Sequence, residues 1–510
     1  MAHVDLPPEV SGTTDLSGAG TVFRNRNFVY LWSAQALSQL ASNMVLAALM
    51  ATVYDSTRSN TAVAFLILTF LIPAVLFSTL GGVLVERSNA RIILLATNIV
   101  RAAGTLGFIL VAPETASANV PLLFLINFVI ATASAVFAPA ELTSIPRIVE
   151  RRHLMAANSI FILTVNATFA LGFGVLGPLV LNVLGPVMVY IIVAVMFGAA
   201  ALAIIPLPAV RPEKAVPAMG AAGRAIRELG SQLAEGAGFV RRHRIIAWSL
   251  TYLAIASSLI GVLGAIGPGF AEEILRLTPQ DFFFIMGPAG LGAVVGILFL
   301  NSYGKEIPKR LIIDIGLVAM GITLVALALV RPITVAFGPA VQPIEDVIPS
   351  IAPLTSLIAM VVVIAVFAGL EYAFVAIPSQ TALQEELPAE VRGRIFGILN
   401  TLLSLASFAP VILAPAVADV LNIFFPGAGI PVVMAFLGLA TLAAGVASWR
   451  RNARAGLHEH DRVEIPPTAA LDDAAAPGAP DVADPSDATS TAAEPPHRRR
   501  RRRRSSSDGD

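Results

Sequence analysis

The distribution of basic residues along the chain is the feature that most restricts its fold. Long apolar stretches divide the sequence, and the gaps between them alternate between gaps rich in Arg and Lys and gaps that nearly lack them. All but four of the 34 Lys and Arg residues fall in the set of gaps that includes both ends of the chain; the exceptions are Arg58, Arg101, Arg276 and Arg331. Because basic residues collect on the cytoplasmic side of membrane proteins, the pattern predicts a multi-pass membrane protein with both termini in the cytoplasm.

Composition supports this class. Charged residues make up 13% of the chain and hydrophobic residues 56%, whereas soluble domains carry roughly 25% charged residues. Since lipid offers the backbone no hydrogen-bond partners, the membrane segments should be helices. The sequence has no cysteine, and it lacks a nucleophile–base pair, a metal-ligand cluster and a phosphate-binding loop. We therefore expect neither an enzyme nor a cofactor nor a metal site.

Twelve apolar stretches approach the ~20 residues that a helix needs to cross a bilayer. They are residues 28–51, 62–85, 92–111, 120–139, 159–183, 187–205, 245–266, 282–300, 311–330, 351–377, 395–420 and 430–447. The domain organisation that follows is a disordered cytoplasmic tail (1–22), a six-helix bundle (23–205), a cytoplasmic linker with an amphipathic helix (206–244), a second six-helix bundle (245–449) and a disordered tail (450–510). We refer to the stretches as spans one to twelve.

The two sets of six spans resemble an internal repeat. Pro139 ends span four and Pro378 ends span ten, and a polar segment with two or more arginines follows each of them. Two repeats joined by a linker predict pseudo-symmetric bundles with a binding site between them near the middle of the membrane. The predicted fold is an all-α membrane protein of twelve transmembrane helices in two six-helix bundles.

The segment after span two carries a motif. Residues 81–91 read GGVLVERSNAR, which resembles the signature loop of the major facilitator superfamily, G-x-L-x-D-R-x-G-R-[KR], with Glu86, Asn89 and Ala90 in place of Asp, Gly and Arg. The resemblance implies the major facilitator fold, alternating access, and a latch that holds the two bundles together where span eleven begins. The latch residues would be Gly82, Glu86, Arg87 and Arg91 on one side and Arg392, Gly393 and Arg394 on the other.

Two further segments are similar to one branch of this superfamily. Residues 139–146, followed by Asn158, and residues 387–397, which read LPAEVRGRIFG, resemble the drug-exporter branch that includes macrolide efflux and enterobactin export proteins. This resemblance implies secondary active export of small amphipathic or apolar compounds, with proton antiport, by a monomer in a bacterial plasma membrane. Alternatives within transport are a lipid or siderophore carrier and a uniporter. An alternative from another class is a membrane scaffold that transports nothing.

Polar residues inside the spans are the candidate site residues, since they are costly in lipid. Gln35, Gln39 and Asn43 are spaced by four and share one face of span one. They are either cavity residues or partners in hydrogen bonds between helices. The full set of substrate-cavity candidates is Gln35, Gln39, Asn43, Asn166, Tyr252 and Tyr372.

Charged residues in the spans suggest a second set of roles. Glu371, the deepest acid, and Asp314 are the candidates for proton coupling, although a local ion pair with Lys309 and Arg310 is the simpler explanation of Asp314. Arg101 is an intramembrane charge that we expect to be structural. Glu141 is expected at the cytoplasmic end of span four, beyond the apolar stretch.

The tail ends in seven consecutive arginines that begin at Arg498 and end at Arg504. The run is either a solvated segment or a contact for anionic lipid of the inner leaflet, at ~1 kcal/mol per residue. No aromatic residue interrupts it, so we do not expect nucleic acid binding.

Overall fold

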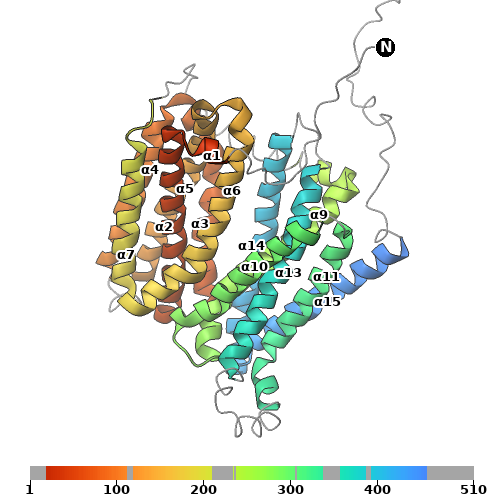
Figure 1. Ribbon diagram of the computed structural model, residues 1–510. Helices are drawn as coiled ribbons and strands as arrows, with labels where there is room; N and C mark the ends of the chain where they lie inside the picture. The colour runs from red at the N-terminus through yellow and green to blue at the C-terminus, as the bar shows by residue number, and fades with distance from the viewer. Residues whose placement is uncertain are drawn as a thin grey trace, which may run out of the picture. The chain divides into compact units, whose positions relative to one another are not determined.

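The computed structural model describes residues 19–111, 119–209, 234, 237–304, 307–336, 356–385 and 392–455. These residues form helices (Figure 1), and no strand occurs among them. The principal helices are α2 (Arg26–Thr57), α3 (Asn60–Arg87), α4 (Ala90–Gly107), α5 (Val120–Ile148), α6 (Leu154–Leu171), α7 (Gly177–Ile204), α9 (Arg244–Glu273), α10 (Phe283–Tyr303), α11 (Lys309–Ala328), α13 (Leu357–Glu385), α14 (Arg392–Phe424) and α15 (Gly429–Arg454). Both predicted tails and most of the predicted linker lie outside the described residues.

Several short helical elements lie between or before the principal helices. A single turn, α1 (Ala19–Val22), precedes α2, and 3-10 turns lie at η1 (Phe108–Leu110), η3 (Arg151–His153) and η5 (Pro279–Phe282). A π-helix, η4 (Gly172–Leu176), links α6 to α7.

Side-chain caps fix where several helices begin. The Asn25 side chain accepts hydrogen bonds from the backbone of Asn27 and Phe28 at the start of α2. Ser59 accepts from the backbone of Ala62 at the start of α3, and Asn89 accepts from that of Arg91 at the start of α4. Each cap satisfies a backbone N–H that has no partner inside its helix.

Proline does not end the helices where the sequence suggested. Helix α5 continues past Pro139 to Ile148, and α13 continues past Pro378 to Glu385. Proline is tolerated inside membrane helices because neighbouring helices and side chains satisfy the backbone groups that it leaves free. Glu141, two residues after Pro139, therefore lies on α5, seven residues before its end, and its side chain is buried.

Within the described residues, eleven helical runs are long and apolar enough to cross a membrane, and one of them, Ala156–Ile204, has 49 residues. A straight helix of that length would measure about 74 Å, more than twice the ~30 Å of a bilayer core. It is broken at Gly185, where φ is 79° and ψ is 172°, and Pro186 follows. The run therefore comprises two spans, and the prediction of twelve transmembrane helices is confirmed.

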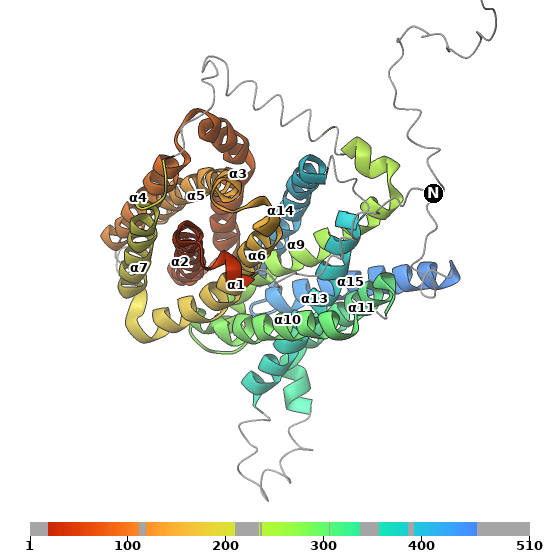
Figure 2. The same cartoon turned by 45° about the horizontal axis from the view of Figure 1, so that its top comes forward.

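The two sets of helices pack in matching ways. In the N-terminal half, from α2 to α7, α3 packs on α5 and α4 packs on α5 and α7. In the C-terminal half, from α9 to α15, the corresponding α10 packs on α13 and α11 packs on α13 and α15 (Figure 2). The repeated pairing agrees with the internal repeat seen in the sequence. Two main apolar clusters result: one lies around Ile266 and Leu317 of the C-terminal half, and the other, around Leu49 and Phe197 of the N-terminal half, also includes Ala271 and Phe282 of the C-terminal half.

Glycines bring helices of each half close together. A Cβ atom on Gly172 would lie 2.8 Å from the Asn43 Cβ on α2, and one on Gly177 would lie 3.0 Å from the Ala47 Cβ. In the C-terminal half a Cβ on Gly321 of α11 would lie 2.6 Å from the Leu442 Cα on α15. Small residues at such positions allow membrane helices to pack backbone to backbone.

The helix ends form two sets. Only two residues join α2 to α3, so Thr57 and Asn60 lie at the same end of the bundle. We call this the acidic end, because Asp55, Glu272, Glu273, Asp281 and Asp419 also lie there. The opposite end, at which α2 begins with Arg26 and α3 ends with Arg87, is the basic end.

Candidate functional site

One carboxylate joins the two halves at the acidic end. Asp419, near the end of α14, accepts hydrogen bonds from the backbone N–H groups of Asn60 (3.1 Å) and Thr61 (2.8 Å) at the start of α3. It also accepts from three side-chain atoms, Ser59 Oγ (2.8 Å), Asn60 Nδ2 (2.8 Å) and Thr61 Oγ1 (2.7 Å). An anion at a helix N-terminus is stabilised both by these free N–H groups and by the helix dipole.

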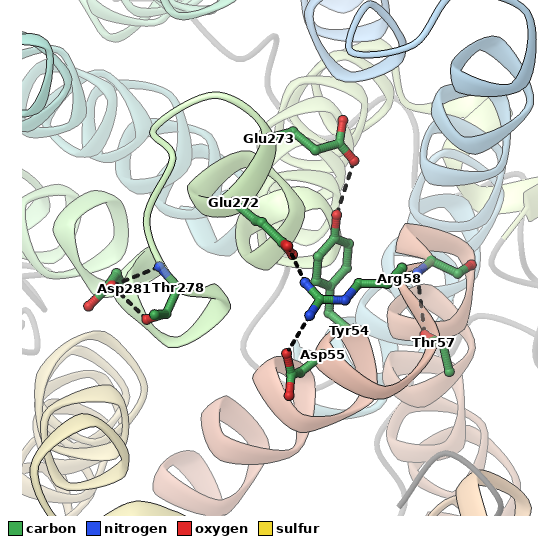
Figure 3. A network of polar contacts seen from close by, with 9 residues as sticks. Tyr54, Asp55, Thr57, Arg58, Glu272, Glu273, Thr278 and Asp281 are labelled. Carbon is green, nitrogen blue, oxygen red and sulfur yellow. Dashed lines mark hydrogen bonds and ion pairs between the residues drawn. The ribbon is translucent and has the colours of Figure 1, made fainter.

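A second set of contacts joins α2 to α9 (Figure 3). Tyr54 donates a hydrogen bond to Glu273 Oε1 at 3.0 Å. Within the C-terminal half, Asn422 of α14 donates to Oε2 of the same carboxylate at 2.9 Å. Arg58 makes ion pairs with Glu272 of the other half and with Asp55 of its own helix. We call the contacts of Asp419, Glu272 and Glu273 with residues 54–61 the acidic-end clasp.

The halves also meet through their backbones near the acidic end. Gly269 of α9 lies so close to Tyr54 and Asn60 that an added Cβ would overlap the Asn60 side-chain oxygen. Gly287 of α10 faces Gly174 of η4, where an added Cβ would lie 3.1 Å from the Gly174 carbonyl oxygen. Nearby, Asn182 of α7 donates a hydrogen bond to Asp281 of η5 at 2.6 Å.

The predicted latch at the basic end lies outside the described side chains. This applies to Gly82, Glu86 and Arg87 in the last turns of α3, and to Arg392, Gly393 and Arg394 in the first turn of α14. Arg91 lies in the first turn of α4, where Asn89 caps its backbone N–H. The latch stays a prediction.

The cavity candidates of span one lie on α2. Gln39 and Asn43 are half-buried on one face, and Asn43 lies against Gly172. Gln35 is buried, and its side-chain carbonyl oxygen has no hydrogen-bond partner. Asn166, on α6, is exposed, and Tyr372 is half-buried against the core of the C-terminal half.

Tyr252 and Asp314 belong to one hydrogen-bonded network at the basic end of the C-terminal half. Asp314 is fully buried and accepts from Ser448 (2.5 Å) and Asn452 (2.9 Å) of α15. The Tyr252 hydroxyl bonds Ser448 at 2.5 Å and accepts from Arg451 at 2.9 Å. Ser448 and Asn452, which are buried polar residues near the end of α15, were not among the residues predicted from the sequence.

The basic neighbours expected to pair with Asp314 have contacts of their own. Lys309 makes an ion pair with Glu385 of α13. The guanidinium of Arg310 lies 4.8 Å from the ring centre of Trp248, a cation–π contact.

Glu371 lies on the side of α13 that faces α11. Its side chain is 5% exposed, and Oε1 accepts a hydrogen bond from Thr323 of α11 at 2.8 Å. Its Oε2 has no partner. Only one of the two carboxylate oxygens of this buried acid therefore has a hydrogen-bond partner.

Arg101 is buried in the N-terminal half, with 2% of its surface exposed. Its guanidinium carbon lies 4.4 Å from the ring centre of Phe137 on α5 and 5.1 Å from that of Phe197 on α7. Its Nε donates to the Thr97 carbonyl at 3.3 Å, and Nη2 has no hydrogen-bond partner. Glu141 of α5, 7% exposed, is the charge that acts on it.

The described residues include no group of three or more His, Cys, Asp or Glu that could hold a metal ion.

The family model described as "Major Facilitator Superfamily" matches residues 31–410. The chain belongs to the Major Facilitator Superfamily. It is therefore a membrane transporter by family, and the fold predicted from the sequence is confirmed.

Solved structures of transporters share this superfamily fold. The nucleoside transporter NupG has a TM-score of 0.61 at 13% identity, covering 83% of this chain and 98% of its own. The POT family transporter PepTSo has a TM-score of 0.58 at 13% identity, covering 86% and 99%. A bacterial homologue of the human lysosomal transporter Spinster, in an inward-facing and unoccupied conformation, has a TM-score of 0.58 at 13% identity, covering 88% and 100%. No curated protein sequence matches the chain.

Proposed function

We propose that this transporter exports small amphipathic or apolar compounds by alternating access, driven by a proton gradient across a bacterial plasma membrane. The acidic-end clasp is the observation that carries the proposal. Alternating access requires the halves to close at one end of the binding site while they part at the other. The clasp supplies a closure of this kind, and it is made of hydrogen bonds and ion pairs that water can replace when the end opens.

The predicted topology is compatible with export. If the basic end lies in the cytoplasm, a state closed by the acidic-end clasp exposes the binding site to the cytoplasm, where an exporter takes up its cargo. Opening of the clasp would then release the cargo outside.

The cargo class follows from the polar face of α2. Gln39 and Asn43 are half-buried amides, which donate and accept hydrogen bonds but carry no charge. Such groups suit neutral or amphipathic compounds better than phosphates or sugar acids, which need basic partners. Glycines 172 and 177 close the space behind this face by packing η4 and α7 on α2.

Geometry favours Glu371 over Asp314 for proton coupling. Asp314 accepts hydrogen bonds on both oxygens from α15, an arrangement that holds α11 to α15. Glu371 has one oxygen without a partner, and a buried carboxyl group in that position binds a proton without breaking an existing contact.

Transport of a panel of fluorescent amphiphiles into or out of proteoliposomes, with and without a pH gradient, tests the proposal. We expect uphill movement with the gradient and only exchange without it. Glu371→Gln should keep exchange and lose the uphill movement. Equal downhill flux with and without the gradient would instead indicate a uniporter, uptake of lipids or siderophores alone would indicate a carrier for them, and the absence of any flux would indicate a scaffold.

A further inference from the structure

A second buried acid, Glu141, lies in the N-terminal half and was not among the candidates for proton coupling. It lies seven residues before the end of α5, which places it about 10 Å from the basic end. Its side chain is 7% exposed, and its Oε1 has no hydrogen-bond partner. A buried polar atom without a partner is uncommon in folded proteins and often marks a functional group or a bridging water.

Arg101, the counter-charge of Glu141, also lacks a hydrogen-bond partner on one of its nitrogen atoms. Arg101 on α4 interacts electrostatically with Glu141, yet its Nη2 has no hydrogen-bond partner and the two groups do not form a direct ion pair. The faces of Phe137 and Phe197 cover the guanidinium. Their quadrupoles stabilise the cation when the carboxylate does not.

The helices next to α4 and α5 carry further polar groups. On α2, Gln35 is buried and its Oε1 also lacks a partner, and Ser38 donates to Asn98 of α4 at 2.6 Å. On α3 the backbone of Gly81 lies against α5, and Glu86 and Arg87 follow towards the basic end with side chains outside the described part of the chain. The basic residues that precede α6, Arg152 and His153, lie at the basic end of the bundle.

We propose that Glu141, with Arg101 as its counter-charge, is a proton-binding site of the transport cycle. This inference rests on the proposed function. A proton from the side of the membrane with the lower pH converts the carboxylate to a neutral carboxyl group. Phe137 and Phe197 then remain to stabilise the Arg101 cation. When the basic end is open, the carboxyl group releases the proton to cytoplasmic water, and the charge pair with Arg101 returns.

The transport experiment compares Glu141→Gln with the wild type in proteoliposomes, using the fluorescent amphiphile that the wild type accumulates fastest. We expect exchange within about twofold of the wild type and loss of the uphill accumulation that a pH gradient drives, because glutamine mimics the protonated acid permanently. Glu141→Asp, which restores an ionisable group, should recover part of the accumulation. The matched control is Glu150→Gln, an exposed acid paired with Arg152 near the same end, which should behave as the wild type.

A second measurement does not depend on cargo. The infrared absorption of protonated carboxyl groups is recorded for the purified protein over a range of pH, and the spectrum of Glu141→Gln is subtracted from that of the wild type. We expect a titrating band in this difference, and in Arg101→Gln the same band should persist to higher pH because the cation that favours the carboxylate is gone.

The two measurements distinguish failure of the proposed function from failure of the inference about Glu141. If no probe is transported by the wild type, the proposed function fails, and the infrared band alone decides whether Glu141 binds a proton. Full gradient-driven accumulation in folded Glu141→Gln, or a difference spectrum without a titrating band, would overturn the inference.

Discussion

Single residues hold the acidic end closed. Asp419 accepts five hydrogen bonds from residues 59–61, and these partners are some 360 positions away in the sequence. Nothing in the local pattern around Asp419 distinguishes it from a solvated acid at a helix end. Contacts of this kind depend on how two distant helices meet, so the sequence analysis could not include them.

Asp419→Asn should weaken this closure. Hydrogen bonds to a charged group contribute about 1.5–3 kcal/mol, so loss of the charge should shift the equilibrium towards an open acidic end by roughly tenfold or more. The measurement is the reaction rate of a cysteine at Ala271, which is fully buried in the apolar cluster that both halves share. A faster reaction with a water-soluble thiol reagent is expected in the Asp419→Asn background.

The matched control is Asp55→Asn. Asp55 is an exposed acid of the same end that pairs with Arg58 of its own half, and its removal should leave the rate at Ala271→Cys within about twofold. Equal rates in the two backgrounds would remove Asp419 from the clasp.

At the scale of helices, two prolines do not end α5, whereas a glycine marks the break in the longest helical run. The sequence pattern predicts that span four ends at Pro139, whereas α5 continues through Pro139 and Pro146. The actual break in a long helical run is at Gly185, whose φ of 79° and ψ of 172° belong to a region that almost only glycine occupies. The residue before a proline also disfavours the helical conformation, so Gly185 and Pro186 act together.

Gly185→Ala should therefore destabilise the protein. Strained backbone of this kind costs on the order of 1–3 kcal/mol for a residue with a Cβ, although open space surrounds the position. The thermal midpoint in detergent should fall. Gly198→Ala is the control, since Gly198 lies in regular helix of the same α7 with open space around it, and alanine there should be neutral or slightly stabilising. A midpoint unchanged by Gly185→Ala would contradict the conformation described.

At the scale of the whole molecule, the arrangement of spans was predictable because it depends on composition along the chain. Apolar length and the alternation of basic residues indicated twelve helices in two halves, and the structure agrees. The site was less predictable. The position of Glu141 within a helix required knowing that α5 passes through a proline. The network in which Ser448 bonds both Tyr252 and Asp314 required knowing that α9 and α11 meet α15.

The orientation in the membrane remains a prediction that the chain is well suited to test, because it contains no cysteine. Pro426→Cys places a thiol in the exposed turn between α14 and α15 at the acidic end, and Ala455→Cys places one just after α15 at the basic end. An impermeant reagent added to intact cells should label the first and not the second. The reverse pattern would place the basic end outside.

The turn at Gly185 also bears on how the protein enters the membrane. Spans five and six are joined by one residue in a conformation that reverses the helix, with no hydrophilic segment between them. A translocation machinery that releases helices one at a time would find no loop to pass across the bilayer after span five. The two helices should therefore insert together as a hairpin, and an epitope or a glycosylation site placed between them should interfere with biogenesis rather than report on it.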